Sequence, residues 1–158
     1  MKKEDKQRFT LRITQANSTE LVVILYEMLL CYLEEAEQAL LADEKAVFHE
    51  AVRKARGCLN ELMGSLHQEY EPAPTLLQLY LFCIRRLARA EQRQNSELFG
   101  EIKRVIVPLH DAYRQIAGQN SAGPIMGNSQ TVYAGLTYGR SSLTENMADQ
   151  GANRGMFA

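Results

Sequence analysis

A recurring spacing of apolar residues constrains this chain more than any other feature. In four stretches, apolar side chains return at alternating intervals of three and four residues, the spacing of one face of an α-helix. The stretches span about residues 18–41, 43–70, 74–92 and 95–118, and no segment before them or between them alternates with a period of two. Short connections between long helices force neighbours to run in opposite directions. The sequence therefore predicts an all-α, antiparallel four-helix bundle, with or without a short fifth helix.

The start of the first helix is unusually apolar. Asn17 can accept a hydrogen bond from a free amide of the first turn, and Glu20 can reach back to it, which together form a capping box. The five residues that follow, 21–25, are all apolar and cover most of the helix circumference. More than one side of this turn must therefore be covered, either by neighbouring helices or by a partner. Asp43 is the residue expected to cap the second helix.

Length and charge exclude several classes of protein. The 158 residues predict one domain with a core of its own, and the net charge of −1 gives no reason to expect nucleic acid as a partner. The apolar stretch 21–33 is shorter than the ~20 residues that span a bilayer and contains Glu27, so we expect no membrane insertion and a cytoplasmic protein. The basic start, residues 1–16, is expected to be a solvated arm before a bundle domain at 17–117.

The residue types that carry chemistry are sparse. Cys31, Cys58 and Cys83 are odd in number and widely spaced, so they are expected to fill the core of a protein in a reducing compartment, with no metal and no cofactor. Histidine phosphotransfer domains are also four-helix bundles, and His110 could be their exposed histidine. Asp111 follows it, however, and no Lys-Gly pair lies one turn later. We expect no enzyme.

The third predicted helix has more apolar surface than one core-facing stripe needs. One stripe suffices for the core: Leu77, Tyr80, Leu81, Ile84 and Leu87. Further apolar residues point at other angles: Leu76, Leu79, Phe82 and Cys83. The helix could be central and covered on several sides by its own bundle. It could equally line a groove for a partner helix, because a helix laid in an apolar groove is a recurring mode of recognition.

Four segments resemble one family. Residues 17–27, Asn-Ser-Thr-Glu-Leu-Val-Val-Ile-Leu-Tyr-Glu, resemble the signature of the flagellar secretion chaperone family FliS. Residues 55–66, 76–80 and 109–113 resemble further parts of that family in the same order, so the resemblance covers about residues 9–117. Ser18 stands where the family often has proline, and Tyr113 stands near its usual tryptophan. These departures concern the details of a groove rather than the fold.

The resemblance implies a cytosolic export chaperone, monomeric or weakly dimeric. Such proteins bind the disordered C-terminal segment of flagellin, prevent its premature polymerisation and hand it to the flagellar type III export apparatus. The residues expected to form the groove are Leu59, Leu62, Leu76, Leu79, Tyr80 and Cys83, with Leu21 and Ile24 at its rim. The alternative is a related adaptor or regulatory bundle that binds another protein.

The composition changes after residue 118. Seven of the ten glycines lie in residues 118–158, together with Pro124 and no lysine. This composition predicts a tail that is either flexible or docked. Within it, Tyr133, Leu136 and Tyr138 are the residues expected to dock on the bundle's own groove or on an export component.

Overall fold

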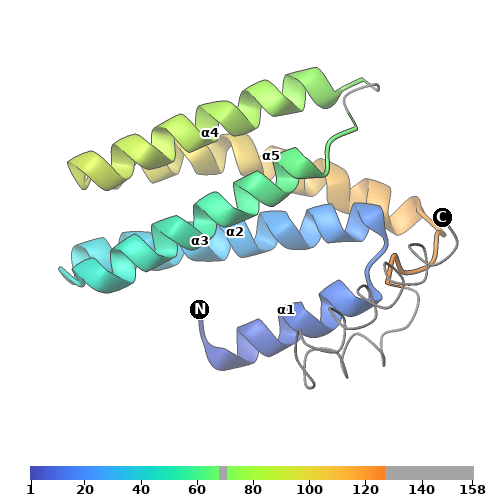
Figure 1. Ribbon diagram of the computed structural model, residues 1–158, viewed down its shortest axis with the longest axis horizontal. Coiled ribbons are helices and arrows are strands. Elements are labelled where there is room, and N and C mark those ends of the chain that lie inside the picture. Colours follow the sequence, from blue (N-terminus) through green and yellow to red (C-terminus); the bar gives the residue numbers. More distant parts are fainter. Residues whose placement is uncertain (68–70, 127–158) are drawn as a thin grey trace, which may run out of the picture.

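The computed structural model describes residues 1–67 and 71–126, and these residues form five α-helices (Figure 1). The helices are α1 (Lys3–Gln15), α2 (Ser18–Leu41), α3 (Lys45–Gly64), α4 (Ala73–Arg93) and α5 (Glu97–Gln119). Within the described ranges there is no strand, which confirms the all-α prediction. The glycine-rich residues 127–158, with Tyr133, Leu136 and Tyr138, lie outside the described residues, so tail docking stays a prediction.

Helices α2 to α5 form the predicted bundle. Helix α2 packs against α3 and α5, and α4 packs against the same two helices on the other side, which closes a ring of four (Figure 1). Helix α1 is added outside this ring, where it packs against α2. In the part of the chain that the structure describes, no helix is both long and apolar enough to cross a bilayer.

The ends of α2 agree with the prediction from sequence, whereas those of α3 differ from it. The capping box is confirmed, because Asn17 Oδ1 accepts from the Glu20 amide at 2.9 Å and Glu20 Oε2 accepts from the Asn17 amide at 3.0 Å. Asp43 does not cap α3. It adopts a left-handed backbone with φ of 55° in the turn between the helices, and the cap position falls on Glu44. Helix α3 also ends at Gly64 rather than near residue 70.

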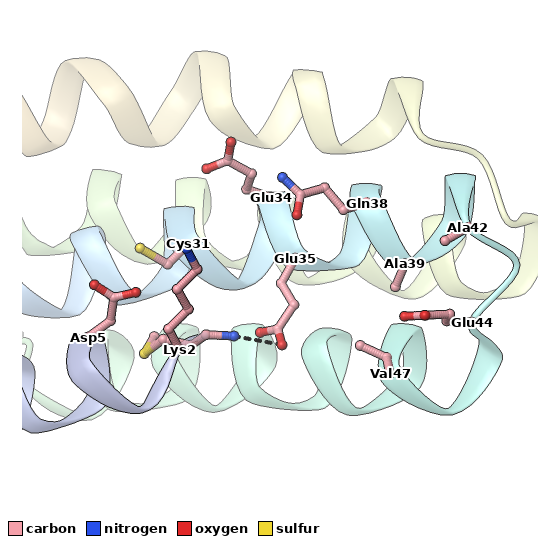
Figure 2. A pocket seen from close by; sticks show the side chains of 11 residues that line it. Lys2, Asp5, Cys31, Glu34, Glu35, Gln38, Ala39, Ala42, Glu44 and Val47 are labelled. Carbon is pink, nitrogen blue, oxygen red and sulfur yellow. Dashed lines mark ion pairs between the residues drawn. The ribbon is translucent and has the colours of Figure 1, made fainter.

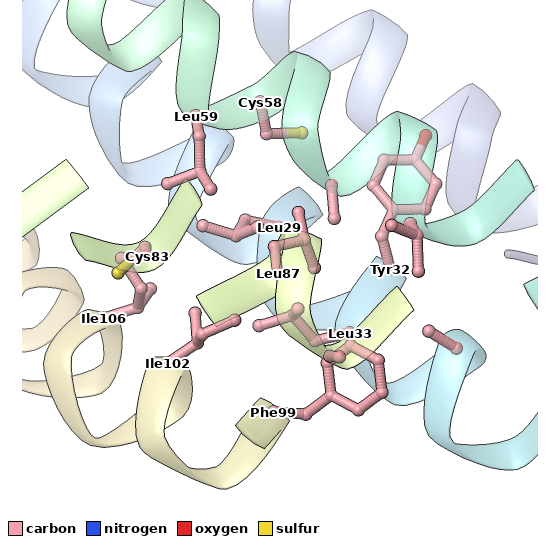
Figure 3. Close-up of a cluster of buried hydrophobic side chains, with 14 of the residues drawn as sticks. Leu29, Tyr32, Leu33, Cys58, Leu59, Cys83, Leu87, Phe99, Ile102 and Ile106 are labelled. Atoms are coloured by element: carbon pink, nitrogen blue, oxygen red, sulfur yellow. The ribbon is translucent and has the colours of Figure 1, made fainter. Parts of the chain in front are cut away.

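The core runs along the centre of the bundle, and Figure 3 shows its side chains converging from α2, α3, α4 and α5. Leu29 and Leu33 of α2, Leu59 of α3 and Leu87 of α4 are fully buried there. Two cysteines are buried and the third, Cys31, is half-buried, which agrees with their predicted role as core fillers. Burial raises the pKa of both the Cys58 and the Cys83 thiol to about 12, so both stay protonated at neutral pH.

The expectation of a solvated arm at residues 1–16 is wrong. Residues 3–15 are helical, and Phe9 is buried in a small cluster with Ile24 of α2 that also includes the half-buried Ile13. Phe9 and Ile13 lie one helical turn apart, so they share one face of α1 while its basic residues occupy the others. The prediction from sequence gave weight to the basic residues of this segment and overlooked the apolar stripe of Phe9 and Ile13.

An ion pair also ties α1 to α2. Arg12 donates through both terminal nitrogens to Glu27, with Nη2 lying 3.2 Å from Oε1. Burial by itself would raise the pKa of the Glu27 carboxyl, but the hydrogen bonds and charge of Arg12, with a smaller effect of His110, outweigh it and lower this pKa. Glu27 is therefore charged at neutral pH and holds α1 in place.

Candidate functional site

A groove lies at the end of the bundle where α2 begins, α3 ends, α4 begins and α5 ends. We call it the end groove. Its volume is about 470 Å³. Its apolar lining consists of Leu21, Val22, Leu25, Leu66, Pro72, Ala73, Leu76, Tyr80, Tyr113 and Ile125. Its polar lining consists of Ser18, Thr19, Ser65, His67 and Glu71, and Gly64 completes it. Apolar side chains beside polar ones suit an amphipathic or apolar peptide segment.

The apolar excess at the start of α2 explains the groove. Val23 and Tyr26 are buried, and Tyr26 belongs to the bundle core, which uses one side of this turn. Leu21, Val22 and Leu25 are only half-buried, and all three line the end groove. Because α3 ends at residue 64, no helix in the described part of the chain, residues 1–67 and 71–126, fully covers this second side of α2. The groove therefore forms where the sequence places apolar surface that the bundle leaves partly uncovered.

The residues predicted to form a groove divide into two sets. Leu76 and Tyr80 of α4 do line the end groove, as its buried floor. Leu59, Leu62 and Cys83 do not, because they are fully buried in the core, where Leu59 and Cys83 can be followed in Figure 3. Their assignment to an open groove is therefore corrected: they face the bundle axis, where neighbouring helices already cover them.

The remaining predicted groove and rim residues lie at different places in the structure. Leu21 lines the end groove, and its role at the rim of a partner-binding groove stays a prediction. Ile24 is buried against α1 instead, because the helical segment that covers it was expected to be a solvated arm. Leu79 is half-buried on α4 and is not among the groove-lining residues. Sequence reasoning did not select Val22 and Leu25, although the excess of apolar residues at 21–25 was the signal that could have identified them.

Two tyrosines hydrogen-bond to each other beneath the groove. Tyr26 and Tyr80 are buried, and their hydroxyl groups are hydrogen-bonded across α2 and α4. Tyr113 packs edge-on against Tyr26, with ring centroids 5.7 Å apart. Burial raises the pKa of Tyr80 to about 12 and that of Tyr26 further, so both hydroxyls stay neutral. This hydrogen bond joins α2 to α4 at the groove floor.

We expect Tyr26→Phe and Tyr80→Phe each to lower the free energy of unfolding by about 1–3 kcal/mol, because each leaves the other buried hydroxyl without a partner. The double variant is expected to lose clearly less than the sum of the two, since it leaves no unpaired hydroxyl. Urea unfolding of the four proteins measures this. Additive losses would show that the two hydroxyls do not depend on each other.

A second hollow, of about 620 Å³, lies between α1, α2 and the start of α3 (Figure 2). Four of its eleven lining residues carry carboxylates: Asp5, Glu34, Glu35 and Glu44. The amino group of Met1 lies 2.7 Å from Glu35 Oε1 and forms an ion pair with it. This hollow is poorly suited to bind an apolar segment, because a bound apolar side chain would remove water from the carboxylates.

His110 is placed poorly for phosphoryl transfer. Its side chain is only 15% exposed, and its Nε2 lies 3.5 Å from a carboxylate oxygen of Glu27. Its Nδ1 lies 3.3 Å from a carboxylate oxygen of Asp111. Both ring nitrogens thus face negative charges, which repel a phosphoryl donor. Among residues 1–67 and 71–126, no group of three or more His, Cys, Asp and Glu side chains is arranged to hold a metal ion.

Comparison with known proteins identifies the family to which the bundle belongs. The family model described as "Flagellar protein FliS" matches residues 1–120, which include all five helices. The chain belongs to the FliS family. It is also similar to the flagellar secretion chaperone FliS of Bacillus subtilis (strain 168), with 25% identity over 103 residues, which cover 65% of this chain and 77% of that protein.

The extent of the match bears on two features of this FliS-family chain. Helix α1 lies inside the matched region, so it belongs to the family domain rather than to an appended arm. The match ends at residue 120, just after α5. Ile125, which lines the end groove, therefore lies outside the matched region.

Proposed function

We propose that this chain is a cytoplasmic flagellar secretion chaperone that binds the C-terminal segment of flagellin in the end groove. Binding would keep that segment from polymerising prematurely until the flagellin reaches the flagellar type III export apparatus. Membership of the FliS family and similarity to a flagellar secretion chaperone support the proposal. The observation that carries it is the apolar lining of the groove at the start of α2.

The chemistry of the groove suits a segment that becomes helical on binding. Such a segment buries apolar anchors spaced by three or four residues, and its polar side faces water. On the groove wall, Leu25 lies three residues after Val22 and four after Leu21, and Leu76 contributes to the floor. Each fully buried anchor of leucine size contributes about 1.5–3 kcal/mol, whereas ordering a disordered segment costs about 2–5 kcal/mol or more. Several anchors are therefore needed, and the groove offers several apolar contacts.

The proposal is tested by titrating a synthetic flagellin C-terminal segment into the full chain, with heat of binding and helical circular dichroism as readouts. We expect saturable binding with a gain of helicity, because the segment would order along the bundle. A scrambled peptide of the same composition serves as the control. If the native and scrambled peptides bind equally weakly, the chain does not recognise flagellin through this segment.

A second candidate is an adaptor of the same family that binds another protein. It is favoured by the finding that Leu59, Leu62 and Cys83 are covered by the bundle itself, which leaves less apolar surface for a long partner. The same titration separates the two candidates. An adaptor would not bind the flagellin segment, although it would still have the apolar end groove.

A further inference from the structure

The segment after α5 folds back onto the junction between α1 and α2. We call residues 120–126 the strap. Asn120 Nδ2 donates to Thr19 Oγ1 at 3.0 Å, and Asn17 Nδ2 donates to the carbonyl oxygen of Ala122 at 3.3 Å. On the bundle side, the acceptor Thr19 lies in the first turn of α2 and the donor Asn17 is its N-cap. The strap is therefore held at the end of the bundle where the end groove opens.

The strap places Ile125 on the groove wall. The Ile125 amide donates to the carbonyl oxygen of Ala16 at 3.1 Å, which fixes the backbone beside the start of α2. Ile125 also belongs to the lining of the end groove, together with Leu76 and Tyr80. Residues 121–126 are otherwise exposed, so hydrogen bonds rather than apolar burial hold the strap.

The exposed fraction of Ile125 shows whether its side chain lines the end groove or fills it. A side chain that filled the groove would itself be buried by the groove-lining residues. Ile125 is 59% exposed although it touches an apolar groove. Its remaining apolar surface is available to a bound segment, and covering it would add to the free energy of binding.

We propose that the strap is part of the partner-binding surface and that Ile125 contacts an apolar side chain of the bound flagellin segment. The inference rests on the proposed function and deepens it. The strap residues 121–126 lie beyond the region matched by the family model, so this contact is a feature of this chain in addition to the matched domain. Asn120 is a positioning residue, because it acts by holding the strap against Thr19.

The test is a double-mutant cycle in the full chain, read by titration with the flagellin C-terminal segment. We expect I125S to weaken binding about fivefold, which is what covering roughly half of an isoleucine side chain contributes. N120A should weaken binding as well, because it releases the strap. In the I125S background N120A should add little, since the residue that it positions is already gone.

The matched control is I116S, because Ile116 is 51% exposed on α5 and does not line the groove. We expect I116S to bind within twofold of the wild type. Equal affinity of I125S and wild type would overturn the proposal, and tighter binding by I125S would show that the strap competes with the partner. Full additivity of I125S and N120A would overturn the positioning role of Asn120.

A readout without flagellin keeps this inference separate from the proposed function. Amide hydrogen exchange at Ile125 should be slow in the wild type and faster in N120A, because the Ile125 amide is hydrogen-bonded only while the strap is in place. Unchanged exchange in N120A would overturn the strap as described. If the Ile125 amide of the wild type is protected but the protein binds no flagellin segment, the proposed function is wrong. The contact between Ile125 and flagellin is then wrong as well, although the strap itself is present.

Discussion

Replacing Leu59 by alanine is expected to lower the free energy of unfolding by about 2–5 kcal/mol, as measured by urea or thermal unfolding. Leu59 is fully buried on α3 and faces the core that α2, α4 and α5 share. Truncating it removes apolar contacts and leaves a cavity that surrounding helices only partly fill. The loss of stability is therefore expected even in the absence of any partner.

The matched control is Leu41→Ala, because Leu41 is 84% exposed at the end of α2. The same chemical change there is expected to alter the free energy of unfolding by no more than about 0.5 kcal/mol. If Leu59→Ala proved as mild as Leu41→Ala but abolished partner binding, Leu59 would be a groove residue after all. That result would restore the interpretation drawn from sequence.

Placing an aspartate at position 22 is expected to weaken binding of the flagellin C-terminal segment at least tenfold, or by about 1.4 kcal/mol or more. Val22 is half-buried on α2 and lines the end groove. A carboxylate at this position would have to be desolvated when an apolar segment covers it. Titration of Val22→Asp with the flagellin segment measures the effect, and circular dichroism checks that the bundle remains helical.

Two further variants make the result at position 22 decisive. Val107→Asp introduces the same charge on α5, at an exposed position that does not line the groove, and is expected to bind like the wild type. Val22→Thr keeps the side-chain shape and is expected to fold and to weaken binding more mildly. Unchanged binding by a folded Val22→Asp or Val22→Thr would mean that the partner is bound elsewhere on the bundle.

The helices of the bundle could be predicted because their signals are local. The capping box at Asn17 and the unbroken periodicity after it predicted the residues at which α2 begins and ends. The end of α3 could not be placed in the same way. The periodicity of its stripe continues to Leu66, but the helix ends at Gly64, and Leu66 lines the groove instead.

The groove was predicted less well, because apolar character does not distinguish a core residue from a binding residue. Leu59 and Leu76 both follow helical spacing, yet only Leu76 reaches the end groove. The difference depends on which helices end nearby, which is a property of the whole bundle. Phe9 shows the same limit, since two apolar residues among many basic ones gave too weak a signal to predict that α1 would dock.

The sequence by itself determined the all-α class, the long helices of the bundle, the capping box and the resemblance to FliS, because these depend on spacing and composition within single segments. Only the tertiary structure decided which apolar residues are core, how α1 docks and where a groove opens. These properties depend on distances between segments far apart in the chain, such as the contact of Asn120 with Thr19. An excess of apolar residues at 21–25 indicates that a second surface must be covered, but only the packed bundle shows where that surface lies.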